Sequence, residues 1–63
     1  MNDLFPATLA EQIAEVEREL AFRERVYARR VASKQMTQDT ADRHMRNMRA
    51  VLATLLNIET ARQ

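Results

Sequence analysis

The sequence predicts an all-α protein in which two helices form an antiparallel hairpin. Its 63 residues include no glycine and one proline, and they are rich in Ala, Leu, Glu and Arg, which are strong helix formers. Apolar residues recur every three or four positions in two segments that only a short polar segment separates. A connection this short makes two helices antiparallel neighbours. We therefore expect a single domain over 1–63, with helices at about 7–33 and 38–61 and a turn at 34–37.

The first helix is predicted by an apolar stripe at helical spacing. The stripe consists of Leu9, Ile13, Val16, Leu20, Tyr27 and Val31. Pro6 stands near its start, where a helix tolerates proline because the first backbone N–H groups have no intrahelical acceptor. Asp3 and Thr8 are both candidates for the N-cap residue. Nothing interrupts the periodic pattern before about Ser33.

The second helix is predicted to begin after Thr37, a good N-cap residue that Asp39 and Asp42 follow in or near the first turn. Its apolar stripe consists of Ala41, Met45, Met48, Leu52 and Leu55, widened by His44, Val51, Leu56 and Ile58. One continuous helix is the alternative, because no glycine or proline enforces a break. The hairpin is favoured because residues 33–37 interrupt the apolar phase and residues 37–40 are typical of a helix start.

Both apolar stripes are wider than a single helix–helix seam requires. Phe22 and Val26 lie about 120° around the first helix from its main stripe. A chain this small rarely holds itself together alone, and the absence of cysteine excludes disulfides. We therefore predict a homodimer that forms an antiparallel four-helix bundle with coiled-coil-like packing, although helices of another protein would cover the same surface. The predicted partner or dimer interface is Phe22, Val26, Tyr27, Met45, Met48, Val51, Leu52, Leu55 and Ile58.

The charges are polarised along the chain. Residues 1–24 carry six acids and two bases, whereas residues 25–49 carry seven bases and two acids. A hairpin would collect the bases at its turn, which predicts contacts with an anion or an acidic partner. The candidate residues are Arg29, Arg30, Lys34, Arg43 and Arg46. Glu11, Glu15 and Glu19 are spaced as a solvated helical face. The net charge of +1 and the 5% aromatic content do not by themselves indicate nucleic acid.

No motif indicates catalysis. Phosphate-binding loops and nucleophile elbows need glycine at defined positions, and the chain has none. A single histidine, His44, and no cysteine leave no familiar zinc-ligand set, and we expect no cofactor, no metal and no enzymatic activity. No apolar run approaches the roughly 18 residues of a membrane span. The first ten residues lack the basic segment of a signal peptide, so a cytoplasmic location is expected.

Three segments of the sequence resemble a known group of proteins. They are Val26-Tyr27-Ala28-Arg29-Arg30-Val31-Ala32-Ser33-Lys34-Gln35-Met36-Thr37-Gln38, Ala41-Asp42-Arg43 and Ala50-Val51-Leu52-Ala53-Thr54-Leu55. Over roughly residues 9–58 the chain resembles short phage- and prophage-encoded helical-hairpin proteins, which generally have no assigned function. Members tend to have a glycine near the turn, where this chain has Lys34 and Gln35. The resemblance implies a bacterial or phage cytoplasmic context and carries over no site residues.

The sequence thus favours a small, non-enzymatic protein-interaction module that pairs with itself and with another protein. By analogy with phage proteins, it would inhibit or adapt a bacterial protein. The alternative is a small dimeric nucleic-acid-binding protein that uses the basic end at the turn.

Overall fold

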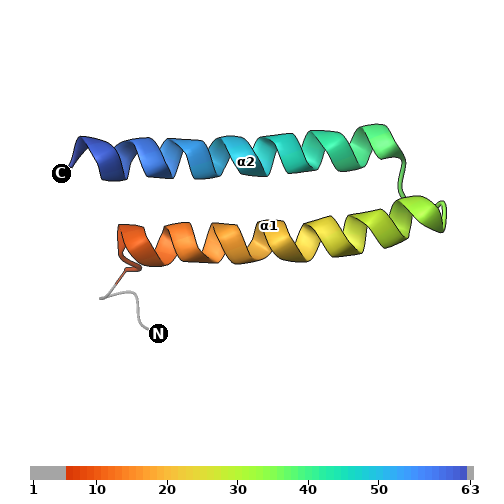
Figure 1. The fold of residues 1–63 in the computed structure, drawn as a ribbon, viewed down its shortest axis with the longest axis horizontal. Helices are drawn as coiled ribbons and strands as arrows, with labels where there is room; N and C mark the ends of the chain where they lie inside the picture. Colours follow the sequence, from red (N-terminus) through yellow and green to blue (C-terminus); the bar gives the residue numbers. More distant parts are fainter. Residues whose placement is uncertain (1–5, 63) are drawn as a thin grey trace.

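The computed structural model describes residues 6–62, which form two α-helices joined by a turn (Figure 1). Helix α1 spans Leu9–Ala32 and helix α2 spans Gln38–Ala61. The two helices run antiparallel and side by side, so the start of α1 and the end of α2 lie at the same end of the molecule (Figure 1). The predicted all-α antiparallel hairpin is therefore confirmed, and the continuous helix is not formed.

A capping box begins α1. The Thr8 hydroxyl oxygen accepts a hydrogen bond from the Glu11 backbone N–H at 3.1 Å, and the Glu11 carboxylate accepts one from the Thr8 backbone N–H at 2.7 Å. Each interaction satisfies a backbone donor that has no intrahelical acceptor. Thr8 is thus the N-cap of α1, while the other candidate, Asp3, lies outside the described residues. At the second helix Thr37 is the N-cap, as predicted, and its hydroxyl accepts from the Thr40 N–H.

The capping box makes the stability of α1 depend on pH. Hydrogen bonds from the backbone and then from the side chain of Thr8 lower the pKa of Glu11 below its ordinary value of 4.5. A lowered folded-state pKa means that ionised Glu11 stabilises the fold above the unfolded-state pKa. This stabilisation is lost as the pH falls through the folded-state pKa. The difference in melting temperature between wild type and Glu11→Gln, measured by circular dichroism, should therefore shrink below about pH 4.5. A difference that stays constant down to pH 2 would contradict this prediction.

The first helix ends in a Schellman motif built without glycine. The Gln35 N–H donates to the Arg30 carbonyl at 2.8 Å, and the Lys34 N–H donates to the Val31 carbonyl at 3.1 Å. Lys34 takes the left-handed conformation that closes this motif, with φ at 64°. The break between the helices therefore comes from a lysine in a conformation that glycine adopts at lower cost.

Replacing Lys34 with glycine should stabilise the hairpin. Glycine has no Cβ to clash in the left-handed region, and this gain exceeds the extra flexibility that glycine adds to the unfolded chain. We expect Lys34→Gly to raise the free energy of unfolding by about 0.5–1 kcal/mol, measured by urea denaturation. Lys34→Ala is the matched control, because it removes the same charge and retains the Cβ. Equal effects of the two substitutions would contradict this explanation.

The core of the hairpin is thin. Ile13 of α1 and Ala41 and Met45 of α2 are buried, and no described side chain is fully enclosed. Near the turn the rings of Tyr27 and His44 meet edge to face, with centroids 6.3 Å apart, and the Arg23 guanidinium lies 6.0 Å from the Tyr27 ring centre. The molecule measures 42 Å along its longest axis and 13 Å along its shortest. It is therefore one helix thick, and each face of the seam between the helices is open to solvent.

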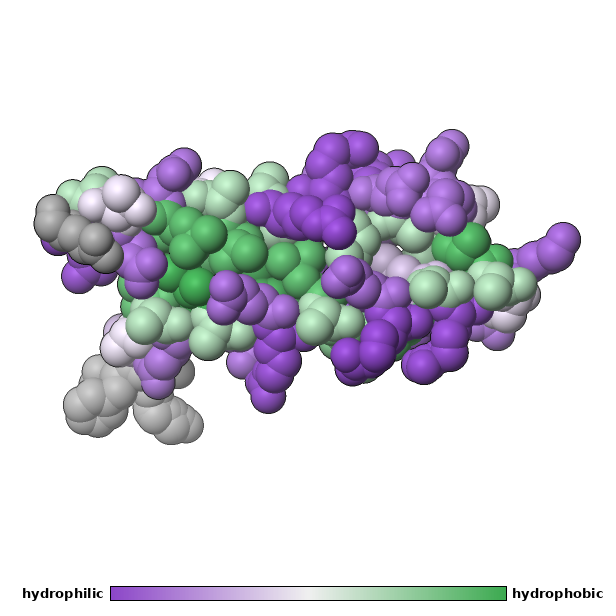
Figure 2. All heavy atoms as spheres, in the orientation of Figure 1, coloured by the Kyte–Doolittle hydropathy of each residue, from purple (hydrophilic) through white to green (hydrophobic). Residues whose placement is uncertain are grey.

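Figure 2 shows the consequence on one of the two faces. Apolar side chains fill the seam over the half of the hairpin near the chain ends, and polar side chains cover much of the half near the turn (Figure 2).

Candidate functional site

Among residues 6–62, four large apolar side chains are strongly exposed. Their exposed fractions are 50% for Phe22, 47% for Val51, 44% for Ile58 and 39% for Leu56. Clustered apolar exposure on a small protein marks an interaction surface more often than isolated apolar residues do. The position of each side chain around its helix therefore decides whether the four form one surface.

Three of the four lie on the same face. Glu15 lines one shallow groove together with Val51 and a second groove, formed by α1 alone, together with Phe22, so Phe22 adjoins the side on which Val51 lies. Ile58 follows Val51 by seven residues, which is two helical turns and the same side of α2. Leu56 lies about 140° around α2 from Val51 and therefore belongs to the opposite side. We call the surface formed by Phe22, Val26, Val51 and Ile58 the apolar face.

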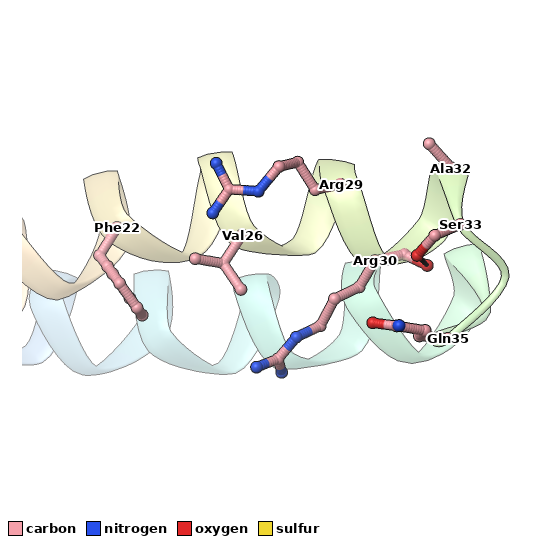
Figure 3. A pocket seen from close by; sticks show the side chains of 7 residues that line it. All are labelled: Phe22, Val26, Arg29, Arg30, Ala32, Ser33 and Gln35. Carbon is pink, nitrogen blue, oxygen red and sulfur yellow. Dashed lines mark hydrogen bonds between the residues drawn. The ribbon is translucent and has the colours of Figure 1, made fainter.

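A third groove continues the apolar face to the turn (Figure 3). Phe22 and Val26 line it beside Arg29 and Arg30, and Ala32, Ser33 and Gln35 close its end. The long side chains of Arg29 and Arg30 extend back from the turn to either side of Val26 (Figure 3). The three grooves are neighbours, because Phe22 lines two of them and Glu15 lines two of them.

The two ends of the hairpin carry opposite charge. Residues 25–49, which form the half near the turn, hold seven bases and two acids for a net charge of +5. The described residues of the other half, 6–24 and 50–62, hold six acids and three bases for a net charge of −3. The hairpin is thus a long dipole whose acidic half contains the chain ends.

Among residues 6–62, two ion pairs form, and both lie on α1. Arg18 and Glu15 are 2.7 Å apart and highly exposed, while Arg23 and Glu19 are 2.8 Å apart and partly buried. The hydrogen bond to Glu15, followed by its charge, raises the pKa of Arg18. Neither pair includes Arg29 or Arg30 at the basic end of the apolar face.

The predicted interface residues divide into two groups. Met45 is buried inside the hairpin, and Tyr27, Met48, Leu52 and Leu55 are half-buried. These five positions have the helical phase of the seam between α1 and α2. The remaining four, Phe22, Val26, Val51 and Ile58, form the apolar face. On α1 the sequence spacing had already separated Phe22 and Val26 from the stripe of Tyr27. On α2 it had not, because Val51 and Ile58 adjoin Met48, Leu52 and Leu55 on one wide stripe.

The structure does not gather the predicted basic residues into one patch. Arg29 and Arg30 line the groove at the turn, and Lys34 lies in the turn itself. Arg43 and Arg46 are exposed on α2 and are not among the residues of that groove. Sequence reasoning also missed Glu15, which it assigned to a solvated helical face. Glu15 precedes Phe22 by seven residues, which is two helical turns, and this spacing already places it on the same side of α1 as Phe22.

Neither a metal site nor a membrane span is found in the described part of the chain. Across residues 6–62 no three His, Asp or Glu side chains are placed to hold a metal ion. Neither α1 nor α2 is apolar enough over its length to cross a bilayer.

Comparison with known proteins identifies no relative. No protein-family model matches the chain, and no curated protein or solved structure does. The resemblance to phage-encoded proteins therefore has no support beyond the helical hairpin that the structure shows.

Proposed function

We propose that this chain is a non-catalytic protein-interaction module that works as a homodimer, in which two hairpins pack their apolar faces together in a four-helix bundle. The observation that carries the proposal is the half-exposure of Phe22, Val51 and Ile58 on one side of the molecule. A hairpin is one layer thick, and a second layer of two helices is the simplest structure that covers this side.

The composition of the apolar face suits an interface. Phe22 and Val26 are apolar, and the charged side chains of Glu15, Arg29 and Arg30 line the same grooves. An apolar centre beside charged groups is the usual composition of a protein interface.

The thin core also favours pairing. The chain has no cysteine, and only three described residues are buried, so neither a disulfide nor a large core stabilises the monomer. Full burial of a large apolar side chain contributes roughly 1.5–3 kcal/mol, and covering a half-exposed one contributes about half of that. In a symmetric dimer every residue of the apolar face contributes twice, which is a large gain for a domain of this size.

Binding at the basic turn end is the further role that we assign to the dimer. Pairing through the apolar face leaves Lys34, Arg43 and Arg46 on the outer surface, where they favour an acidic protein partner. Nucleic acid is the competing partner class, because the half near the turn carries a net charge of +5. The separation of Arg43 and Arg46 from the groove of Arg29 and Arg30 weighs against a continuous phosphate-binding track.

Sedimentation equilibrium of the purified chain tests the dimer directly. We expect the mass of two chains at micromolar concentration and a melting temperature that rises with protein concentration. A folded monomer whose melting temperature is independent of concentration would overturn the proposal. In a parallel titration with a fluorescent DNA duplex, we expect no binding at physiological salt. If the duplex bound and its affinity fell steeply with rising salt, nucleic acid would be the partner class in place of an acidic protein.

A further inference from the structure

We infer that the second copy packs on the apolar face with its turn at the opposite end, with Phe22 near the two-fold axis and Glu15 of each hairpin beside Arg29 of the other. This arrangement rests on the proposed dimer and specifies its geometry. It makes α1 pack antiparallel against α1 of the second copy.

The spacing of three residues on α1 carries the inference. Glu15 precedes Phe22 by seven residues and Arg29 follows it by seven, so all three lie on the same side of the helix, one above the other. A two-fold axis at Phe22 that crosses the helices reverses their direction. Each position before Phe22 in one hairpin therefore lies at the level of the equally distant position after Phe22 in the second copy. Glu15 of each hairpin lies in this way beside Arg29 of the other, so the dimer contains two such pairs.

The charges beside the apolar face favour the same arrangement. Turns at opposite ends place Arg29 and Arg30 over the half of the second copy that contains Glu15. Turns at the same end would instead place these two arginines over the basic half of the second copy. Groups within about 8 Å of each other interact with little screening at physiological salt, so juxtaposed faces sense this difference. Complementary charge therefore selects the orientation, while apolar contact at Phe22 and Val26, next to the axis, supplies most of the affinity.

The existing ion pair of Glu15 does not prevent the contact. Glu15 holds Arg18 through two hydrogen bonds of 2.7 Å, but the side chains of this pair are largely exposed. Exposed pairs of this kind contribute little to stability. A carboxylate accepts several hydrogen bonds, so Glu15 can hold Arg18 and receive Arg29 of the second copy together.

Spin labels on single cysteines test the orientation, since the chain has no cysteine of its own. In Lys34→Cys the label marks the turn, and in Ala21→Cys it marks the level of the axis. Pulsed electron–electron double resonance should give a distance of about 36 Å or more between the two labels at residue 34. This distance equals the length of a 24-residue helix. The labels at residue 21 should lie within about 25 Å of each other, given the 8–10 Å between packed helices.

The two labels distinguish failure of the orientation from failure of the dimer. A short distance at residue 21 with a short distance at residue 34 would place the turns together and overturn the orientation, while the proposed dimer would stand. No dipolar coupling at either position would overturn the dimer itself.

Charge exchange tests the pair of Glu15 and Arg29. Glu15→Arg and Arg29→Glu should each raise the dimer dissociation constant about tenfold, because each loses two attractions and creates two repulsions. The double variant should return to within about threefold of wild type. Glu17→Arg is the matched control, since residue 17 lies about 200° around α1 from residue 15 and should leave the constant unchanged. Additive weakening in the double variant would overturn the proposed contact.

Discussion

Replacing both Phe22 and Val51 with glutamine should raise the dimer dissociation constant more than 100-fold. The two side chains are half-exposed in the hairpin, and dimerisation would cover them in both copies. Losing about half of the burial energy of four large side chains removes about 3–6 kcal/mol, and each 1.4 kcal/mol is a factor of ten. Sedimentation velocity over a concentration series measures the change. The helicity of the variant at micromolar concentration should fall at the same time, because the hairpin loses the contribution of its second layer.

Leu56→Gln is the control for this double variant. Leu56 is exposed to a similar extent and lies on the opposite side of α2. Its replacement should leave the dissociation constant within about twofold of wild type, because a surface substitution away from an interface changes stability by about 0.5 kcal/mol or less. Equal weakening by Leu56→Gln and by either single change in the apolar face would show that the apolar face is not the dimer surface.

Replacing Ile13 with alanine should remove a large part of the stability of the fold. Ile13 is the one described residue of α1 that is buried, and it lies in the seam that joins α1 to α2. Shortening a buried isoleucine to alanine costs about 2–5 kcal/mol. The whole stability of a domain this size is only about 3–9 kcal/mol. Chemical denaturation at fixed protein concentration should therefore show a much lower midpoint, and heating should show a correspondingly lower melting temperature.

Leu56→Ala provides the comparison for Ile13→Ala. It deletes a side chain of similar size from an exposed position outside the apolar face. The expected loss is about 1 kcal/mol, because the leucine is already 39% exposed in the folded state. If both substitutions lowered the midpoint equally, the seam would not be the structural core of the hairpin.

The sequence by itself determined the two helices, their antiparallel order and the start of α2. Apolar residues at steps of three and four dictate a helix because that spacing aligns them on one side. Thr37 marks a helix start because its short hydroxyl side chain satisfies a backbone N–H within the first turn. These are local effects, and each depends on residues that are near one another in the chain.

Only the tertiary structure decided which apolar residues of α2 form the seam and which form the apolar face. Val51 and Leu52 are adjacent in the chain and belong to one predicted stripe, yet Leu52 is half-buried and Val51 is exposed. The packing of α2 on α1 places Glu15 in one groove with Val51, although 35 intervening residues separate them in the sequence. Periodicity defines directions around each helix separately, whereas the relative rotation of two helices depends on how their side chains interlock.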